Sequence, residues 1–127
     1  MNDTDPFSYT ILRVVPSVER GERFNVGVVL FCRQRQFLDL RVALDPDRLR
    51  ALAPAVATDE LTAHLEGLVR VARGDPDAGG VAALDQSERF GWLSAPSSTV
   101  VQPSEVHTGL CEDPEQTLDA LFQRLVA

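Results

Sequence analysis

The feature that most constrains the fold is a pair of apolar segments joined by a short polar connection. Residues 7–15 (FSYTILRVV) and 24–32 (FNVGVVLFC) are rich in β-branched and aromatic residues, which favour strands. Consecutive strands joined by so short a connection pair most simply as antiparallel neighbours. The two segments are therefore predicted to form a β-hairpin.

The second of these strands is apolar on both faces, which is typical of a central strand covered on both sides. Gly27 lies inside it and indicates a bulge or the close approach of another backbone. In residues 36–43 (QFLDLRVA), leucine and valine alternate with charged residues, which predicts a third, half-buried strand. The three strands together predict an antiparallel meander.

After residue 43 the hydrophobic period changes from that of a strand to that of a helix. Asp45 and Pro46 are typical of a helix start, so a short helix is predicted at residues 46–52. A longer helix is predicted to follow Thr58, its expected N-cap, and to stop at Gly74.

The rest of the chain is less regular until its last segment. Residues 86–96 (QSERFGWLSAP) are expected to be irregular, and residues 98–109 are expected to form one or two short strands. Asp113 begins a capping pattern before an apolar helical face, which predicts a C-terminal helix. The fold class is thus α+β, with an N-terminal antiparallel meander of about three strands, joined by one or two later short strands and packed against two or three helices.

The length and net charge of the chain disfavour some classes of function. The chain has 127 residues, which fit one domain over residues 1–127. The net charge of −7 disfavours binding to nucleic acid. No apolar run is long enough for a membrane span, and the acidic N-terminus lacks the pattern of a secretory signal, so a cytoplasmic location is expected. All twelve basic residues are arginine, a bias typical of GC-rich bacterial genomes.

The polar connection of the hairpin contains the binding residues that we consider first. Glu19, Arg20, Glu22, Arg23 and Asn25 can converge with Arg13 at one end of the sheet. An arginine there would bind a carboxylate or phosphate, and Glu22 and Asn25 would fix its geometry. The candidate binding residues are Arg13, Arg20, Glu22 and Asn25. A turn also collects polar residues for conformational reasons alone, with Gly21 at a positive φ angle. Both interpretations remain open from the residues.

Other reactive residues give weaker patterns. His107 is a secondary site residue, because it can act as a base beside Cys111 or a serine. Cys32, Cys111, His64 and His107 lack the close cysteine pair of a structural zinc site, so no metal is predicted. The chain has no phosphate-binding loop or dinucleotide motif, and no cofactor is predicted.

The hairpin sequence resembles a known family. Residues 9–31 (YTILRVVPSVERGERFNVGVVLF) are similar to the signature of the uncharacterised bacterial family known as domain of unknown function 3037. Residues 98–110 and 113–126 are also similar to its actinobacterial members. The resemblance implies a small companion or regulatory protein for a kinase-like protein of the high-persistence toxin type. It also favours Arg13, Glu22 and Asn25 as a true site.

Three hypotheses follow for function. The first is a cytoplasmic interaction module that binds a protein partner, such as a kinase-like one, through the hairpin end and a face of the sheet. The second is a small hydrolase or nucleotide-handling enzyme, with Glu22 as acid or base and Arg13 or Arg20 as anion clamp. The third is a homodimer formed through a sheet edge or apolar face. A deep cleft joining Glu22, Asn25 and His107 would favour the enzyme.

Overall fold

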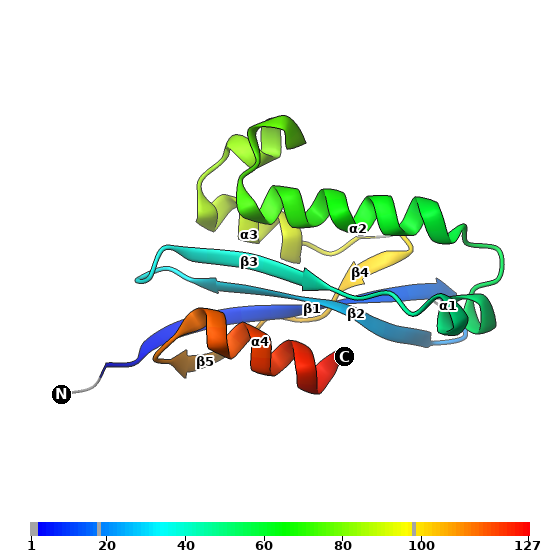
Figure 1. Cartoon of the computed structure of the whole chain (residues 1–127), viewed down its shortest axis with the longest axis horizontal. Helices are drawn as coiled ribbons and strands as arrows, with labels where there is room; N and C mark the ends of the chain where they lie inside the picture. Colours follow the sequence, from blue (N-terminus) through cyan, green and yellow to red (C-terminus); the bar gives the residue numbers. More distant parts are fainter. Residues whose placement is uncertain (1–2, 18, 98) are drawn as a thin grey trace.

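The computed structural model describes residues 3–17, 19–97 and 99–127, in which one sheet lies between helices (Figure 1). The strands are β1 (Asp5–Ser17), β2 (Glu22–Cys32), β3 (Phe37–Val42), β4 (Val101–Pro103) and β5 (His107–Cys111). The α-helices are α1 (Pro46–Leu52), α2 (Thr58–Arg73), α3 (Gln86–Ser94) and α4 (Pro114–Leu125). Two short 3-10 helices, η1 (Pro76–Ala78) and η2 (Gly80–Ala83), connect α2 to α3.

The sheet confirms the predicted α+β class and its meander. The strand order is β3-β2-β1-β4, with antiparallel pairing throughout, and β5 also pairs with β1. Residues 12–14 of β1 pair with β4, whereas residues 5–9 pair with β5. The two late strands therefore lie one after the other along the same side of β1. The predicted range 98–109 does contain short strands, although its first residue, Ser98, lies outside the described residues.

The junction between β4 and β5 is held by a buried polar cluster. The backbone N–H of Ile11 donates to Ser104 Oγ at 2.9 Å, and Thr10 Oγ1 donates to the carbonyl of Ser104 at 2.7 Å. Ser104 N–H in turn donates to the carbonyl of Ile11 at 2.7 Å. Because buried polar groups are costly when unpaired, these bonds fix the point where the chain leaves β4.

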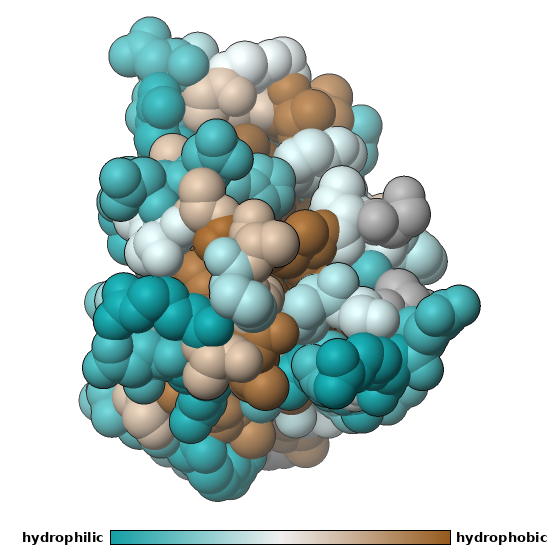
Figure 2. Space-filling view, turned by 90° about the vertical axis from the view of Figure 1, so that its right-hand side faces the viewer, coloured by the Kyte–Doolittle hydropathy of each residue, from teal (hydrophilic) through white to brown (hydrophobic). Residues whose placement is uncertain are grey.

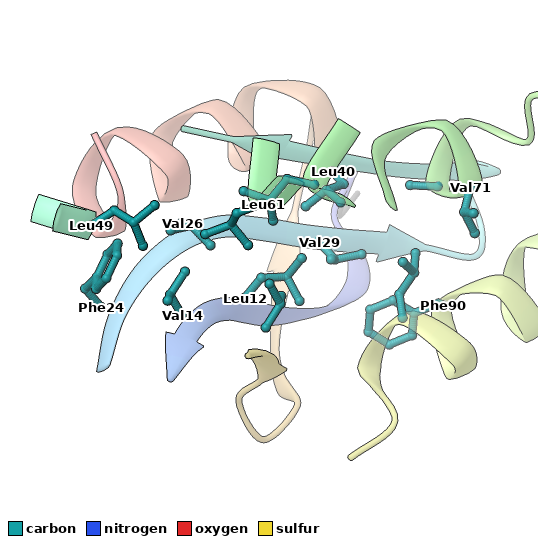
Figure 3. Packing of buried hydrophobic residues seen from close by; sticks show 14 of the residues in the cluster. Leu12, Val14, Phe24, Val26, Val29, Leu40, Leu49, Leu61, Val71 and Phe90 are labelled. Atoms are coloured by element: carbon teal, nitrogen blue, oxygen red, sulfur yellow. The ribbon is translucent and has the colours of Figure 1, made fainter. Parts of the chain in front are cut away.

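The helices cover the two faces of the sheet unequally. Helices α2 and α3 lie over the face that we call upper, and α4 lies under the opposite, lower face (Figure 1). The upper core contains Leu12, Val26 and Leu40 of the strands together with Leu61 and Phe90 of the helices (Figure 3). The lower core is smaller and consists of Phe7, Val28, Leu30, Cys32, Cys111, Leu118 and Leu121.

A β-bulge in β2 lets Val26 pack in the upper core and Val28, two residues later, pack in the lower core. Leu12 is paired with Gly27 but the next residue, Arg13, is paired with Asn25, so Val26 is the extra residue. The close approach predicted for Gly27 is also present, because a Cβ atom there would lie 3.1 Å from the carbonyl oxygen of Arg41 in β3. Both predictions for this glycine are confirmed.

Helices α1 and α4 begin directly after the capping residues that the sequence predicts. Asp45 and Asp113 accept hydrogen bonds from backbone N–H groups in the first turns of α1 and α4, as predicted. For α2 the predicted cap was one residue off, since Thr58 is the first helical residue and Ala57 precedes it.

The expectation of an irregular segment at residues 86–96 was wrong, because residues 86–94 form α3. Asp85 caps this helix by accepting a hydrogen bond from the N–H of Glu88 at 2.8 Å. Phe90 and Leu93 are its buried residues. Tertiary packing of these two residues overrides the low helix propensity of Gly91.

The outer edge of β3 carries side-chain contacts in place of a partner strand. Asp39 Oδ1 accepts the backbone N–H of Leu40 at 2.8 Å and the Nε–H of Arg73 at 3.1 Å. A charged residue that occupies an edge donor opposes pairing with another chain. This arrangement gives no support to a homodimer formed through β3.

Among residues 3–17, 19–97 and 99–127, no helix has the length and apolar character needed to cross a bilayer.

Candidate functional site

The candidate site lies on the lower face of the sheet, near the hairpin turn. Helix α4 ends before it reaches the turn, so this end of the lower face extends past the helix (Figure 1). Figure 2 looks directly onto this end of the molecule and shows hydrophobic residues at the surface between hydrophilic ones. This end of the molecule, which also includes α1, therefore has a mixed polar and apolar surface.

Arg13 lies at the centre of this surface. Its neighbours across the sheet are Asn25 in β2 and Gln102 in β4. Strand alternation places Arg13 opposite the buried Leu12 and Val14, on the lower face. A cavity of about 210 Å³ opens beside it and is lined by Arg13, Val15, Gly21, Arg23, Gln102 and Pro103.

Two arginines, Arg13 and Arg23, line this cavity without an ion pair within the described residues. Six other arginines form ion pairs with carboxylates of the same chain. They are Arg20, Arg35, Arg41, Arg50, Arg70 and Arg73. In the part of the chain that the structure describes, the side chains of Arg13 and Arg23 form neither an ion pair nor a hydrogen bond. Their donors are therefore available to an external acceptor.

The pKa of the Arg13 guanidinium reflects this environment. Burial and then the charge of Arg23 lower the pKa of the Arg13 guanidinium, whereas the nearby carboxylate of Glu105 raises it. Arginine stays charged in proteins, so Arg13 remains a cation. An arriving anion would relieve the repulsion between the two arginines.

Asn25 braces the site from α4. Its Nδ2 donates to the carbonyl of Leu125 at 3.0 Å, in the last turn of the helix. Carbonyls at a helix C-terminus lack intrahelical partners, so this bond satisfies one of them and fixes the end of α4 beside Arg13. Asn25 thus supports the site, and its Nδ2 donor is already bonded within the protein.

Arg20 and Glu22 form a separate pair at the turn. Arg20 Nη2 lies 2.8 Å from Glu22 Oε1, and the Arg20 side chain is 74% exposed. Strand alternation places Glu22 with Phe24, on the upper side of the hairpin. The structure therefore brings Arg13 and Asn25 together and leaves Arg20 and Glu22 apart from them. Gly21 between them has a φ angle of 69°, as the turn interpretation predicts.

His107 is the first residue of β5, which pairs with β1 at a distance from Arg13. It is paired with Tyr9 and stacks on its ring, with the ring centroids 5.1 Å apart. Tyr9 is four residues from Arg13, which corresponds to about 13 Å along a strand. His64 lies on α2, above the sheet, whereas Cys32 and Cys111 lie in the lower core. In the described residues, no group of three or more histidine, cysteine or acidic residues can hold a metal ion.

The more voluminous cavities lie elsewhere. One, of about 480 Å³, lies at the β3 edge between α2 and α4 and is lined by residues that include Val69 and Phe122. Another, of about 280 Å³, lies between α2, α3 and β4 and includes His64 and Trp92. Neither is lined by Glu22, Asn25 or His107.

Cys111 gives a testable pH dependence. Burial, followed by the neighbouring Cys32, raises the pKa of the Cys111 thiol from 9.0 to about 11. Between these two pH values the unfolded chain releases a proton that the folded protein retains, so stability falls as the pH rises. We expect urea unfolding to show this loss from pH 9 to 10.5. Cys111→Ala is expected to flatten the slope, and an equally steep slope in that variant would contradict the assignment.

Sequence reasoning grouped Arg23 with the polar residues near Arg13 but did not select it as a binding residue. Its position two residues before Asn25 places it on the same face of β2, but its proximity to Arg13 depends on the register across the bulge. The one available signal was Gly27, which indicated a bulge without giving the pairing on either side of it.

The structure defines a small α+β protein in which one antiparallel sheet lies between two unequal helical layers. Residues 9–126 match the model of a family described as protein of unknown function (DUF3037). The chain therefore belongs to this family. No curated protein and no solved structure has a significant match to it.

Proposed function

We propose that this protein is a small interaction module that binds a protein partner through the hairpin end of its lower sheet face. The observation that carries the proposal is the pair of unpartnered arginines, Arg13 and Arg23, at a concave surface that α4 does not cover. Unsatisfied charge-assisted donors on a rigid sheet are suited to recognition of an acidic group.

The partner that we propose first is a kinase-like protein of the high-persistence toxin type, in the cytoplasm of a bacterium. This choice rests on the family resemblance of the hairpin sequence. Support for binding over catalysis comes from Glu22, the acid or base of the enzyme hypothesis, because it pairs with Arg20 at the turn. The two cavities of about 480 and 280 Å³ are not lined by Glu22, Asn25 or His107, which also supports binding over the hydrolase or nucleotide-handling alternative.

Co-expression with a kinase-like protein of the high-persistence toxin type from the same organism tests the proposal. We expect the two proteins to co-purify and to elute together in size-exclusion chromatography. Arg13→Glu with Arg23→Glu is expected to abolish the complex, because two attractive charges become repulsive. Arg50→Glu is the matched control, since Arg50 lies on α1 and pairs with Asp47.

Thermal unfolding must first show that the double variant is folded. A complex that forms equally well with the double variant, or no complex with the wild-type protein, would overturn the proposed function.

A further inference from the structure

The cavity between Arg13 and Arg23 has a charge that selects among anions. Arg13 and Arg23 contribute two positive charges, and the carboxylate of Glu105, which lines the adjoining cavity with Gln102 and Pro103, attracts Arg13 and offsets part of this charge. The local excess is therefore less than two positive charges, in a protein whose net charge is −7. A group with a single negative charge matches this excess better than a dianionic phosphate.

The residues that line the cavity favour an ion pair between the two arginines and an anion. Val15 and Pro103 are apolar and lie beside the guanidinium groups, which reduces the local dielectric constant and strengthens an ion pair. Gln102 Nε2 donates to the carbonyl of Thr99 at 3.0 Å, so this amide is held in place. Asn25 is held by α4 on the other side of Arg13.

The available space fits a small group. The volume of about 210 Å³ far exceeds the ~15 Å³ that an ordered water needs, so a carboxylate can enter with part of its side chain. A planar guanidinium binds a carboxylate through two parallel N–H···O bonds, and a second guanidinium can bind its remaining lone pairs.

From this geometry we infer that the cavity is a carboxylate site that receives an aspartate or glutamate side chain of the partner. The inference rests on the proposed function, since it names the group on the partner that the module recognises. Arg13 and Arg23 donate to the carboxylate, while Asn25 and Gln102 flank Arg13 on the neighbouring strands. Glu105 lowers the affinity for more highly charged groups.

A peptide titration followed by NMR of the arginine Nε–H signals tests this site without the partner. The probes are the capped peptides Gly-Gly-Glu-Gly-Gly, Gly-Gly-Gln-Gly-Gly and Gly-Gly-phosphoserine-Gly-Gly. We expect the glutamate peptide to shift the signals of Arg13 and Arg23 saturably, and the glutamine peptide to leave them unchanged. Arg13→Gln with Arg23→Gln is expected to weaken glutamate binding at least tenfold, and Arg50→Gln to leave it unchanged.

Three outcomes would overturn the inference: no saturable shift with the glutamate peptide, equal binding by the double variant, or tighter binding of the phosphoserine peptide. The last outcome would identify a phosphate site instead. The backbone spectrum of each variant shows whether it is folded. If the kinase-like protein binds through Arg13 and Arg23 but the glutamate peptide does not, the carboxylate site fails and the interaction module stands. If only the peptide binds, the proposed function fails and the site stands.

Discussion

Leu118→Ala is expected to lower the free energy of unfolding by about 2–5 kcal/mol. Leu118 is fully buried and packs in the lower core with residues of β1, β2 and α4. Truncation removes buried apolar surface and leaves a cavity that its neighbours fill only in part. The lower core is the smaller of the two, and Leu118 is its fully buried residue on α4. The ion pair of Arg41 with Asp119 and the bond from Asn25 to Leu125 also hold the helix to the sheet.

Leu110→Ala is the matched control, because Leu110 is 66% exposed on β5. We expect that variant to stay within about 0.5 kcal/mol of the wild-type protein. Urea unfolding of both variants measures the difference. Similar stabilities for the two would mean that α4 contributes little to the fold.

Loss of Leu118 is also expected to loosen the binding site. The end of α4 is tied to β2 by the bond from Asn25 to Leu125, next to Arg13. A helix that detaches takes this brace away, so the affinity for the glutamate peptide should fall together with stability.

Gly27→Val is expected to destabilise the protein by about 1–3 kcal/mol. A Cβ atom at this position would lie 3.0 Å from Val42 Cγ1 and 3.1 Å from the backbone oxygen of Arg41. Valine adds two methyl groups to an approach that is already tight, so β3 must move away from β2. Thermal unfolding should show a clear decrease in melting temperature.

Gly67→Ala is the control for this substitution and should have the opposite sign. Gly67 lies in α2, and nothing lies within 4 Å of a Cβ atom built there. Alanine has a higher helix propensity than glycine, so stability should rise by about 0.4–1 kcal/mol. A Gly27→Val variant as stable as the wild-type protein would show that β3 adapts without cost.

The sequence predicts most elements because their signals are local. The hairpin, β3 and the C-terminal helix follow from alternation, apolar periodicity and the caps of α1 and α4. Helix α3 could not be predicted, because its formation depends on the burial of Phe90 and Leu93 against distant strands. The tandem placement of β4 and β5 along β1 likewise depends on long-range contacts.

The candidate site could be predicted only in part. Arg13 and Asn25 were selected and do lie side by side, but the bond from Asn25 to Leu125 joins residues 100 positions apart. Arg20 and Glu22 satisfy each other at the turn, which a sequence cannot distinguish from convergence on Arg13. The role of Arg23 required the register around the bulge.

The capped edge of β3 also bears on how this protein behaves at high concentration. With Leu40 N–H occupied by Asp39, amyloid-like stacking has no free donor at that position. The opposite side of the sheet consists of β4 and β5, which are three and five residues long and are interrupted at Ser104. A strand that adds to either side of the sheet would therefore meet an occupied donor at Leu40 or the break between β4 and β5.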